Sequence, residues 1–468
     1  MEGATVFAAS LRNGLSRLIV GVMAWVAVAG SCFAGSNPIG LAFDPGFGTA
    51  GFSTIPLQPV ADAGSSAVPI GVIHLAVGGG YVLASLQRVS SVYRIVLTRY
   101  TEAGMLDTSW GVNGSQMPAL PSPHVDFGFI SGNETNTMRL VAGSENGQDI
   151  FYLAFSLRQG VDDFSVAVAK FVASGAFDSS FGFGGYAVSK LPNSAPGGLD
   201  RLRGAAFTLV FGLPVLVVVV EAPGNRLVFS RAHGAGSAAL SDQGGGSSVL
   251  FSSSLTITQV RTNGPNHIEL VGRLGTEALY ADYDAGTLAL NYRTTVFPCP
   301  FSTAGSVIDA IERPAGWNGD VLVAARADCP TVGIVSLVAR IAAVATAPNM
   351  VWYASTGTND ASCTIATTPL PCLPAMLAYS ANYPGVAITR TPNSRLVPVD
   401  VINGRAMEAT PFSALSVDGS IVPNFSSYRG TLFRYPRLVG FGQLAGSGTA
   451  QYGIAGLFVD GLFINGFN

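Results

Sequence analysis

Leu106-Asp107-Thr108-Ser109-Trp110-Gly111-Val112-Asn113-Gly114 is one of three nine-residue segments that decide the fold of this chain. The other two align with it without gaps: Phe43-Asp44-Pro45-Gly46-Phe47-Gly48-Thr49-Ala50-Gly51 and Phe177-Asp178-Ser179-Ser180-Phe181-Gly182-Phe183-Gly184-Gly185. We call each segment a box, and all three share the pattern apolar-Asp-x-x-aromatic-Gly-x-x-Gly. Their aspartates lie 63 and 71 positions apart. Recurrence at such a period indicates a repeat protein.

The box residues are predicted to be structural. An aspartate accepts hydrogen bonds from backbone N–H groups two residues on and so holds a tight turn. The aromatic residue is expected to fill the core beneath its box, and the glycines to adopt backbone angles that other residues avoid. A catalytic group is seldom needed once per repeat. The predicted structural set is Asp44, Phe47, Gly48, Gly51, Asp107, Trp110, Gly111, Gly114, Asp178, Phe181, Gly182 and Gly185.

Strand–turn–strand patterns continue beyond the boxes. Strands are predicted over 93–100 and 164–171, directly ahead of the second and third boxes. Apolar runs separated by Gly, Pro or Asn predict seven hairpins, with turns centred near residues 79, 146, 213, 265, 317, 393 and 447. The uncharged run 204–220 resembles a transmembrane helix, but Gly212 and Pro214 interrupt it, so two buried strands are predicted there.

The segments ahead of two boxes carry a family resemblance. Arg99-Tyr100-Thr101-Glu102-Ala103-Gly104-Met105-Leu106-Asp107 closely resembles the delta-60 repeat, a bacterial repeat with an Arg-Tyr-x-x-x-Gly turn before its box. Ala169-Lys170-Phe171-Val172-Ala173-Ser174-Gly175-Ala176-Phe177-Asp178 is similar, with a basic-aromatic variant. Good copies cover only residues 43–190. The resemblance implies a propeller-like fold and a family whose members mostly have no known activity.

We therefore expect an all-β fold, a single β-propeller over residues 35–468. A four-stranded blade buries both faces only by stacking on its neighbours, and a closed ring leaves no end blade exposed. Seven blades are predicted, with six or eight as alternatives. The N-terminal box segment is expected to supply the outer strand of the last blade and close the ring. An outer-membrane β-barrel is the rival fold, which strands of five to eight residues disfavour.

Residues 1–34 are predicted to be a signal peptide. Arg12 and Arg17 precede an apolar stretch over 18–29, and Cys32-Phe33-Ala34 forms a small-x-small cleavage site. The protein is therefore expected to be exported, to the periplasm, the medium or the cell surface, with no integral membrane segment after cleavage. A lipoprotein attached through Cys32 is the alternative.

Export favours disulfides among the four remaining cysteines, Cys299, Cys329, Cys363 and Cys372. Four cysteines allow three pairings, of which Cys299–Cys329 with Cys363–Cys372 is preferred as joining near neighbours in sequence. A zinc site is disfavoured because no C-x-x-C pair and no nearby His accompany them.

Composition excludes several classes of partner. The 25 basic and 28 acidic residues provide no basic face, so nucleic-acid binding is not expected. The G-x-G-x-x-G spelled by residues 46–51 coincides with a box and precedes no helix, so no dinucleotide cofactor is predicted.

Catalytic and metal-binding patterns are also missing from the sequence. No G-x-S-x-G occurs, and His74, His124, His233 and His267 are scattered. Asp162-Asp163 and Asp282-x-Asp284 are assigned to turns or solvent rather than to a cation. No catalytic residue, metal or cofactor is predicted. Trp317, between Pro314 and Asn318, is predicted to be exposed and is the one candidate ligand contact.

Three functions stay open at this point. The preferred one is a secreted or periplasmic binding or scaffold module whose partner is an unknown protein or glycan. An extracellular glycan-acting hydrolase or lyase is the second, for which several Asp, Glu, His or Arg side chains should converge near the central channel. A cell-surface structural or adhesion protein is the third. Fold alone does not decide among them.

Overall fold

The computed structural model describes 24 segments of the chain, all within one compact unit, Gly40–Asp460. Every regular element in them is a β-strand. Over these residues there is no helix of the length and apolarity that a membrane span requires. The described segments are 40–44, 46–49, 52–55, 67–89, 92–118, 126–127, 138–158, 164–189, 201–222, 224–233, 240–241, 248–295, 305–314, 317, 319–329, 333–342, 349–358, 377–379, 386–390, 396–401, 405–406, 425–434, 437–444 and 452–460.

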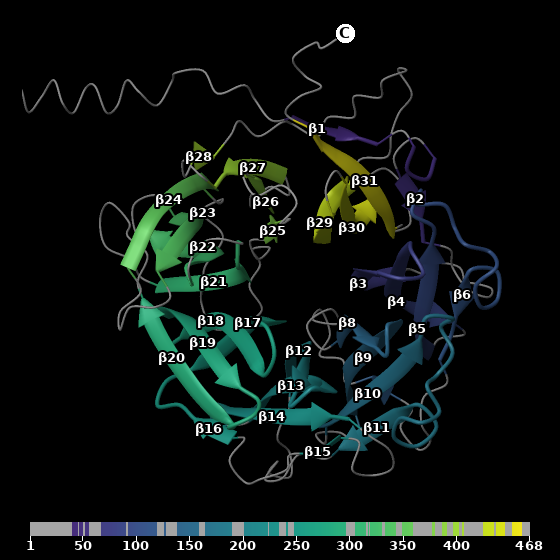
Figure 1. The fold of residues 1–468 in the computed structure, drawn as a ribbon. Helices are drawn as coiled ribbons and strands as arrows, with labels where there is room; N and C mark the ends of the chain where they lie inside the picture. Colours follow the sequence, from purple (N-terminus) through teal and green to yellow (C-terminus); the bar gives the residue numbers. More distant parts are fainter. Residues whose placement is uncertain are drawn as a thin grey trace, which may run out of the picture. The chain divides into compact units, whose positions relative to one another are not determined.

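The described strands form seven antiparallel sheets, which we number along the chain (Figure 1). Sheet 1 contains β3 (Ala67–His74), β4 (Tyr81–Val89), β5 (Val92–Tyr100) and β6 (Ser115–Gln116). Sheet 2 contains β7 (Asp126–Phe127), β8 (Met138–Glu145), β9 (Gln148–Arg158), β10 (Phe164–Val172) and β11 (Tyr186–Ser189). Sheet 3 contains β12 (Arg201–Val210), β13 (Leu213–Ala222), β14 (Arg226–Ala232), β15 (Leu240–Ser241) and β16 (Ser248–Leu250).

The remaining sheets repeat this order. Sheet 4 contains β17 (Leu255–Thr262), β18 (His267–Leu274), β19 (Glu277–Asp284) and β20 (Ala289–Thr295). Sheet 5 contains β21 (Gly305–Glu312), β22 (Val321–Cys329), β23 (Gly333–Ala342) and β24 (Asn349–Thr358). Sheet 6 contains β25 (Leu377–Tyr379), β26 (Val386–Arg390), β27 (Leu396–Asp400) and β28 (Arg405–Ala406). Sheet 7 contains β29 (Phe425–Arg434), β30 (Arg437–Leu444) and β31 (Tyr452–Asp460), joined by β1 (Gly40–Phe43) and β2 (Phe52–Thr54).

The sheets form a β-propeller arrangement. The first long strand of each sheet contacts that of the next, in the order β3, β8, β12, β17, β21, β25, β29, and β29 contacts β3 in turn. Figure 1 shows these strands innermost and the later strands of each sheet farther out. The predicted all-β propeller fold is therefore confirmed.

The two ends of the described unit lie in one sheet. β1 pairs antiparallel with β31, with Gly40 opposite Asp460, and β2 pairs with the other half of the same strand, with Phe52 opposite Ala455. This is the pairing expected from the position of the first box. It joins segments about 400 residues apart, so the sheet forms only when both ends of the unit meet.

Several inner strands carry a β-bulge at a similar place. The ladder shifts register at Ile70 in β3, Arg203 in β12, Thr258 in β17 and Asp309 in β21. A bulge bends a strand and increases its twist. The residue after the bulge in β12 is Gly204, where a Cβ would lie 2.2 Å from Val260 Cγ2 of sheet 4. Close approach of neighbouring inner strands therefore excludes a side chain there.

The predicted hairpins are found, but two of them join different strands of their sheets from the ones expected. The first five match the first two long strands of sheets 1–5, and the uncharged run 204–220 forms most of β12 and β13 rather than a helix. The last two predicted hairpins instead match β26–β27 in sheet 6 and the vicinity of β30–β31 in sheet 7, one strand later than expected. Turn residues mark any antiparallel connection, and without intact boxes no local pattern shows which two strands of a sheet a given turn joins.

Hydrogen bonds join turns of neighbouring sheets at one end, which we call the turn face. In an antiparallel sheet whose strands follow one another in the chain, the turn between the first two long strands lies at the same end as the connection between the third and fourth. Asp149 in β9 accepts from the backbone N–H groups of Ala76, Val77 and Gly78 in sheet 1, at 2.8–2.9 Å. In sheet 4, Asn266 donates its N–H to the Leu209 carbonyl of sheet 3 at 2.9 Å. These bonds place the linked turns on one face of the propeller.

Candidate functional site

The box aspartates hold turns as predicted. Asp44 Oδ1 accepts from Gly46 N at 2.9 Å. Asp107 Oδ1 accepts from Ser109 N at 3.2 Å, and Asp178 Oδ1 accepts from Ser180 N at 3.0 Å. The box glycines that the structure describes lie at positive φ: Gly48, Gly111, Gly114, Gly182 and Gly185. Gly51 lies outside the described residues.

Each box aspartate also faces a basic side chain that the sequence analysis did not assign to it. Arg99 Nε lies 3.4 Å from Asp107 Oδ2, and Lys170 Nζ lies 2.8 Å from Asp178 Oδ2. Arg99 and Lys170 stand at the same place before their boxes, in β5 and β10. In sheet 7 that place is held by Gly456, and Arg437 of the adjacent strand β30 reaches Asp44 Oδ2 instead, at 2.6 Å from its Nε.

The box aromatics are buried, but two of them pack against the next repeat rather than only beneath their own box. Phe47, Trp110 and Phe181 are 0%, 3% and 2% exposed. A Cβ at Gly104 would lie 2.5 Å from Phe47 Cδ1, and the Trp110 indole N–H donates to the Ala173 carbonyl at 3.0 Å. The prediction that these aromatics fill the core is therefore confirmed, and for Phe47 and Trp110 the space that the ring fills includes the turn ahead of the following box.

Trp317 is half-buried, which corrects the prediction that it is exposed. Its ring packs against the apolar cluster between sheets 5 and 6, and the Arg340 guanidinium lies 4.4 Å from the ring centroid. Arg340 is itself paired with Asp320, with 2.8 Å between Nε and Oδ2. One face of the ring is therefore covered by a cation that its own sheet supplies.

Other predicted positions fall partly or wholly outside the described residues. Residues 1–34 and Cys299, Cys363 and Cys372 lie outside them, and only the backbone of Cys329 is described, at the end of β22. Asp284 caps a turn as expected, accepting from Gly286 N at 2.8 Å, and Asp282 Oδ2 lies 3.3 Å from His267 Nδ1. No group of three or more His, Cys, Asp or Glu suited to a metal occurs in the part of the chain that the structure describes.

A hollow of about 180 Å³ between sheets 2 and 3, which we call the Lys170 pocket, has room for a ligand. Sheet 2 contributes Glu145 at the end of β8, Tyr152 in β9, Lys170 in β10 and two residues of the third box. Sheet 3 contributes the start of β13 and the residue after β14. Its lining residues are Glu145, Tyr152, Lys170, Ser180, Phe181, Pro214 and His233.

Lys170 forms ion pairs with two carboxylates at this pocket. Its ammonium donates to Glu145 Oε2 at 2.5 Å and lies 2.8 Å from Asp178 Oδ2, while its side chain is 7% exposed. Burial acts to lower the pKa of Lys170, but the hydrogen bonds to Asp178 and Glu145 outweigh it, so the pKa lies above its ordinary value. Burial acts to raise the pKa of Asp178, but the bonds from Lys170 and Ser180 leave it below its ordinary value.

These shifts fix the charges in the pocket. Lys170 remains an ammonium and Asp178 a carboxylate across the physiological range, because their pKa values are moved away from neutrality. A general acid or base works best with a pKa near the operating pH. The pair is therefore suited to holding a ligand by charge and hydrogen bonds rather than to transferring protons.

Two large apolar side chains close in sequence to lining residues of the Lys170 pocket are exposed. Phe183, two residues beyond the lining Phe181, is 63% exposed, and Leu213, next to the lining Pro214, is 67% exposed. Exposed side chains of this size beside a polar hollow are typical of binding sites, where a few polar groups fix orientation and apolar groups supply contact area.

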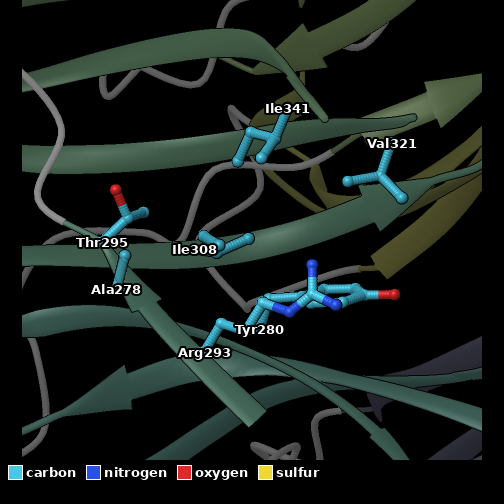
Figure 2. A pocket seen from close by; sticks show the side chains of 7 residues that line it. All are labelled: Ala278, Tyr280, Arg293, Thr295, Ile308, Val321 and Ile341. Atoms are coloured by element: carbon cyan, nitrogen blue, oxygen red, sulfur yellow. The ribbon is translucent and has the colours of Figure 1, made fainter. Parts of the chain in front are cut away.

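A second polar cluster lies between sheets 4 and 5 but offers little space. Glu269 is fully buried; its Oε1 accepts from Tyr280 Oη at 2.8 Å and from Arg313 Nε at 2.6 Å. Burial is the main cause that raises the pKa of Tyr280. The adjoining cavity measures about 10 Å³, room for one water molecule at most. Figure 2 shows the seven side chains that line it, which come from strands of both sheets.

One signal in the sequence pointed to Lys170 and was not used. The chain has only two lysines, Lys170 and Lys190, against 23 arginines. Lys170 replaces the arginine of the Arg-Tyr pair in the preceding repeat, and an ammonium on a flexible stem reaches two carboxylates as a point charge. Glu145, Tyr152 and His233 carried no such signal, because they come together only through the packing of two sheets.

Comparison with known proteins gives similarity of structure only. No protein-family model and no curated protein matches this sequence. A crystal structure of a protein from Lactobacillus plantarum is 13% identical, with a TM-score of 0.39, over 75% of this chain and 86% of that one. A crystal structure of the RRP9 WD40 repeats is 12% identical, with a TM-score of 0.43, over 86% of this chain and all of the other.

Proposed function

We propose that this protein is an exported β-propeller that binds a hydroxyl-rich ligand, a glycan end group, in the Lys170 pocket. The observation that carries the proposal is the buried Lys170, which is held between Glu145 and Asp178 and lines a 180 Å³ hollow. Propellers commonly serve as binding or scaffold modules, and their loop-bearing faces are where partners bind.

The chemistry of the lining favours a sugar over other small ligands. Glu145 supplies acceptors, Lys170 supplies a donor, and Ser180, Tyr152 and His233 can each donate or accept. Sugar hydroxyls also do both. The volume lies below the 300–1,000 Å³ or so of pockets for drug-sized ligands, so the site suits a single ring.

The further details of the proposal have separate support. A count of seven blades, rather than six or eight, is supported by one inner strand from each sheet in the cycle of contacts from β3 to β29. Membership of the delta-60 repeat family is supported by the shared turn and box around Asp107 and Asp178. Export to the periplasm, cell surface or medium is supported by the charged and apolar leader and its cleavage pattern, residues 1–34.

The experiment is a glycan array followed by calorimetry with the saccharide that binds best. Glu145→Gln and His233→Ala remove two lining groups that lie outside the box and are each expected to weaken binding about tenfold, roughly 1.4 kcal/mol. The matched control is Glu102→Gln, an exposed carboxylate of sheet 1 outside the pocket, which should leave affinity unchanged. Folded protein that binds no glycan, or binding that both lining variants leave intact, would overturn the proposal.

A further inference from the structure

The turn between β12 and β13 places a phenylalanine in a backbone conformation that it rarely adopts. Phe211 and Gly212 form a two-residue turn closed by the Val210–Leu213 pair, with φ of +51° and +80°. Such a turn needs positive φ at both positions, and Asn-Gly is its preferred sequence. A bulky non-glycine residue at positive φ is a steric outlier.

The neighbouring sheet makes the same turn with the preferred sequence. Asn146-Gly147 joins β8 to β9 with φ of +52° and +73°. Folding of the hairpin therefore does not require an aromatic residue at this place. The Phe211 side chain is 80% exposed, so it contributes little to the core. A strained and exposed aromatic residue indicates a role outside folding.

Sheet 4 holds this tip in place. Asn266 Oδ1 accepts from the Phe211 N–H at 3.3 Å, and the Asn266 N–H donates to the Leu209 carbonyl at 2.9 Å. Thr208 Oγ1 donates to the Gly264 carbonyl at 3.1 Å. These bonds from a second sheet fix the hairpin backbone, so Phe211 is presented from a rigid support.

Phe211 belongs to a wider set of apolar tips on the turn face. Ten large apolar side chains are exposed among the residues that the structure describes, and seven of them lie in turns on this face or at the strand ends next to those turns, in sheets 1, 2 and 3. They are Val77, Met105, Val112, Phe183, Leu209, Phe211 and Leu213.

We propose that the turn face of sheets 1–3 docks on the surface of a lipid bilayer, with Phe211 inserted at the level of the acyl chains. The apolar residues are carried on four separate connections between strands rather than in one groove, and a fluid bilayer needs no shape complementarity to receive them. The set contains no Trp or Tyr, two of the residues that dominate energetic hot spots between proteins. Burial of apolar surface supplies the attraction.

Charge on the turn face argues for a neutral lipid surface. Lys170 and Arg99 are 7% and 19% exposed and each is paired with a box aspartate, whereas the carboxylates of Glu102 and Glu145 are 55% and 32% exposed. Acidic groups of this kind do not attract anionic headgroups. Binding should therefore occur on zwitterionic lipid and depend little on salt, in contrast to polybasic membrane anchors.

The test is flotation of the full-length protein with phosphatidylcholine vesicles, which carry no sugar and so leave the proposed glycan site uninvolved. Phe211→Asn restores the Asn-Gly turn of the neighbouring sheet. It is expected to lower the vesicle-bound fraction at least tenfold and to raise the melting temperature slightly. The matched control is Leu250→Asn, which removes a side chain that is 71% exposed at the opposite end of sheet 3 and should change neither binding nor salt dependence.

Phe211→Trp gives a second measurement, since insertion shifts the indole emission to shorter wavelength when phosphatidylcholine vesicles are added. Three results would overturn the proposal. One is folded wild-type protein that stays unbound to vesicles, and another is Phe211→Asn that floats as well as the wild type. The third is loss of self-association, rather than of vesicle binding, in Phe211→Asn, which would assign the tip to a protein contact.

Discussion

Trp110 occupies the space that a side chain at Gly175 would need. A Cβ built on Gly175 would lie 2.1 Å from Trp110 Cζ2, far inside contact distance. Trp110 belongs to the second box, in sheet 1, and Gly175 to the turn ahead of the third box, in sheet 2. The Phe47–Gly104 pair repeats the relationship one box earlier. The glycine of the Arg-Tyr-x-x-x-Gly turn thus leaves the space that the aromatic ring of the preceding box fills.

Gly175→Ala is predicted to destabilise the protein by about 3 kcal/mol. The added methyl group meets the Trp110 ring, and overpacking of a filled core costs about 1–3 kcal/mol in addition to the strain of alanine at positive φ. The measurement is the urea dependence of unfolding, followed by tryptophan fluorescence and circular dichroism.

Gly184→Ala is the matched control for that substitution. Gly184 has φ of +68°, close to the +82° of Gly175, but nothing lies within 4 Å of a Cβ built there. It should cost only about 1 kcal/mol. Trp110→Leu in the Gly175→Ala background should recover part of the loss. Equal effects of the two alanine substitutions would show that the ring contact is not what excludes a side chain.

Asp149→Asn is predicted to lower the free energy of unfolding by about 2–4 kcal/mol. The Asp149 side chain is 5% exposed and accepts three backbone N–H groups, from Ala76, Val77 and Gly78. An amide offers one oxygen, so at least one of the three N–H donors loses its partner, and hydrogen bonds to a charged group are worth about 1.5–3 kcal/mol.

Hydrogen exchange locates the effect of Asp149→Asn. The amides of residues 76–78 should exchange much faster in the variant, whereas those in the interior of β4 should change only in proportion to global stability. Glu102→Gln serves as the comparison. Glu102 Oε1 also accepts a backbone N–H in this turn, from Gly80 at 3.1 Å, but the Glu102 side chain is 55% exposed. Its effect should stay below about 1 kcal/mol.

The Lys170–Asp178 pair predicts loss of stability at both ends of the pH range. The folded-state pKa of Asp178 lies below its ordinary value, so its contribution is full above the unfolded-state pKa and disappears as the pH falls through the folded-state pKa. The folded-state pKa of Lys170 lies above its ordinary value, so its contribution is full below the unfolded-state pKa and is lost as the pH rises through the folded-state pKa.

Asp178→Asn tests the acid side. The variant should be less stable than the wild type at pH 7, and the difference should shrink as the pH is lowered below 4 or so, where the unfolded-state carboxyl also becomes protonated. Unfolding curves recorded from pH 2 to pH 7 measure this. A difference that is the same at every pH would mean that Asp178 acts through its turn geometry and not through its charge.

Local patterns in the sequence predicted the turns and the fold class. The contact from Asp107 to the N–H two residues on lies within the box, so the residues that form it are neighbours in the chain. Alternation of apolar and polar residues predicted strands, and two breakers within 204–220 excluded a membrane helix. Where no good copy of the box occurs, these local patterns predicted where turns lie but not which two strands each turn joins. The last two hairpins were therefore assigned to the first two long strands of their sheets, one strand too early.

By itself, the sequence determined that the chain is a repeating all-β protein whose units must stack. Apolar strands with a core-facing pattern bury their faces only against other sheets, and this requirement follows directly from the order of apolar and polar residues in the chain. Only the tertiary structure decided what lies between the sheets. The contacts of Trp110 with Gly175, of Lys170 with Glu145, and of Asn266 with the Phe211 turn each join residues separated by strand pairing or sheet packing. Their geometry depends on register and on the angle between sheets, which no local pattern specifies.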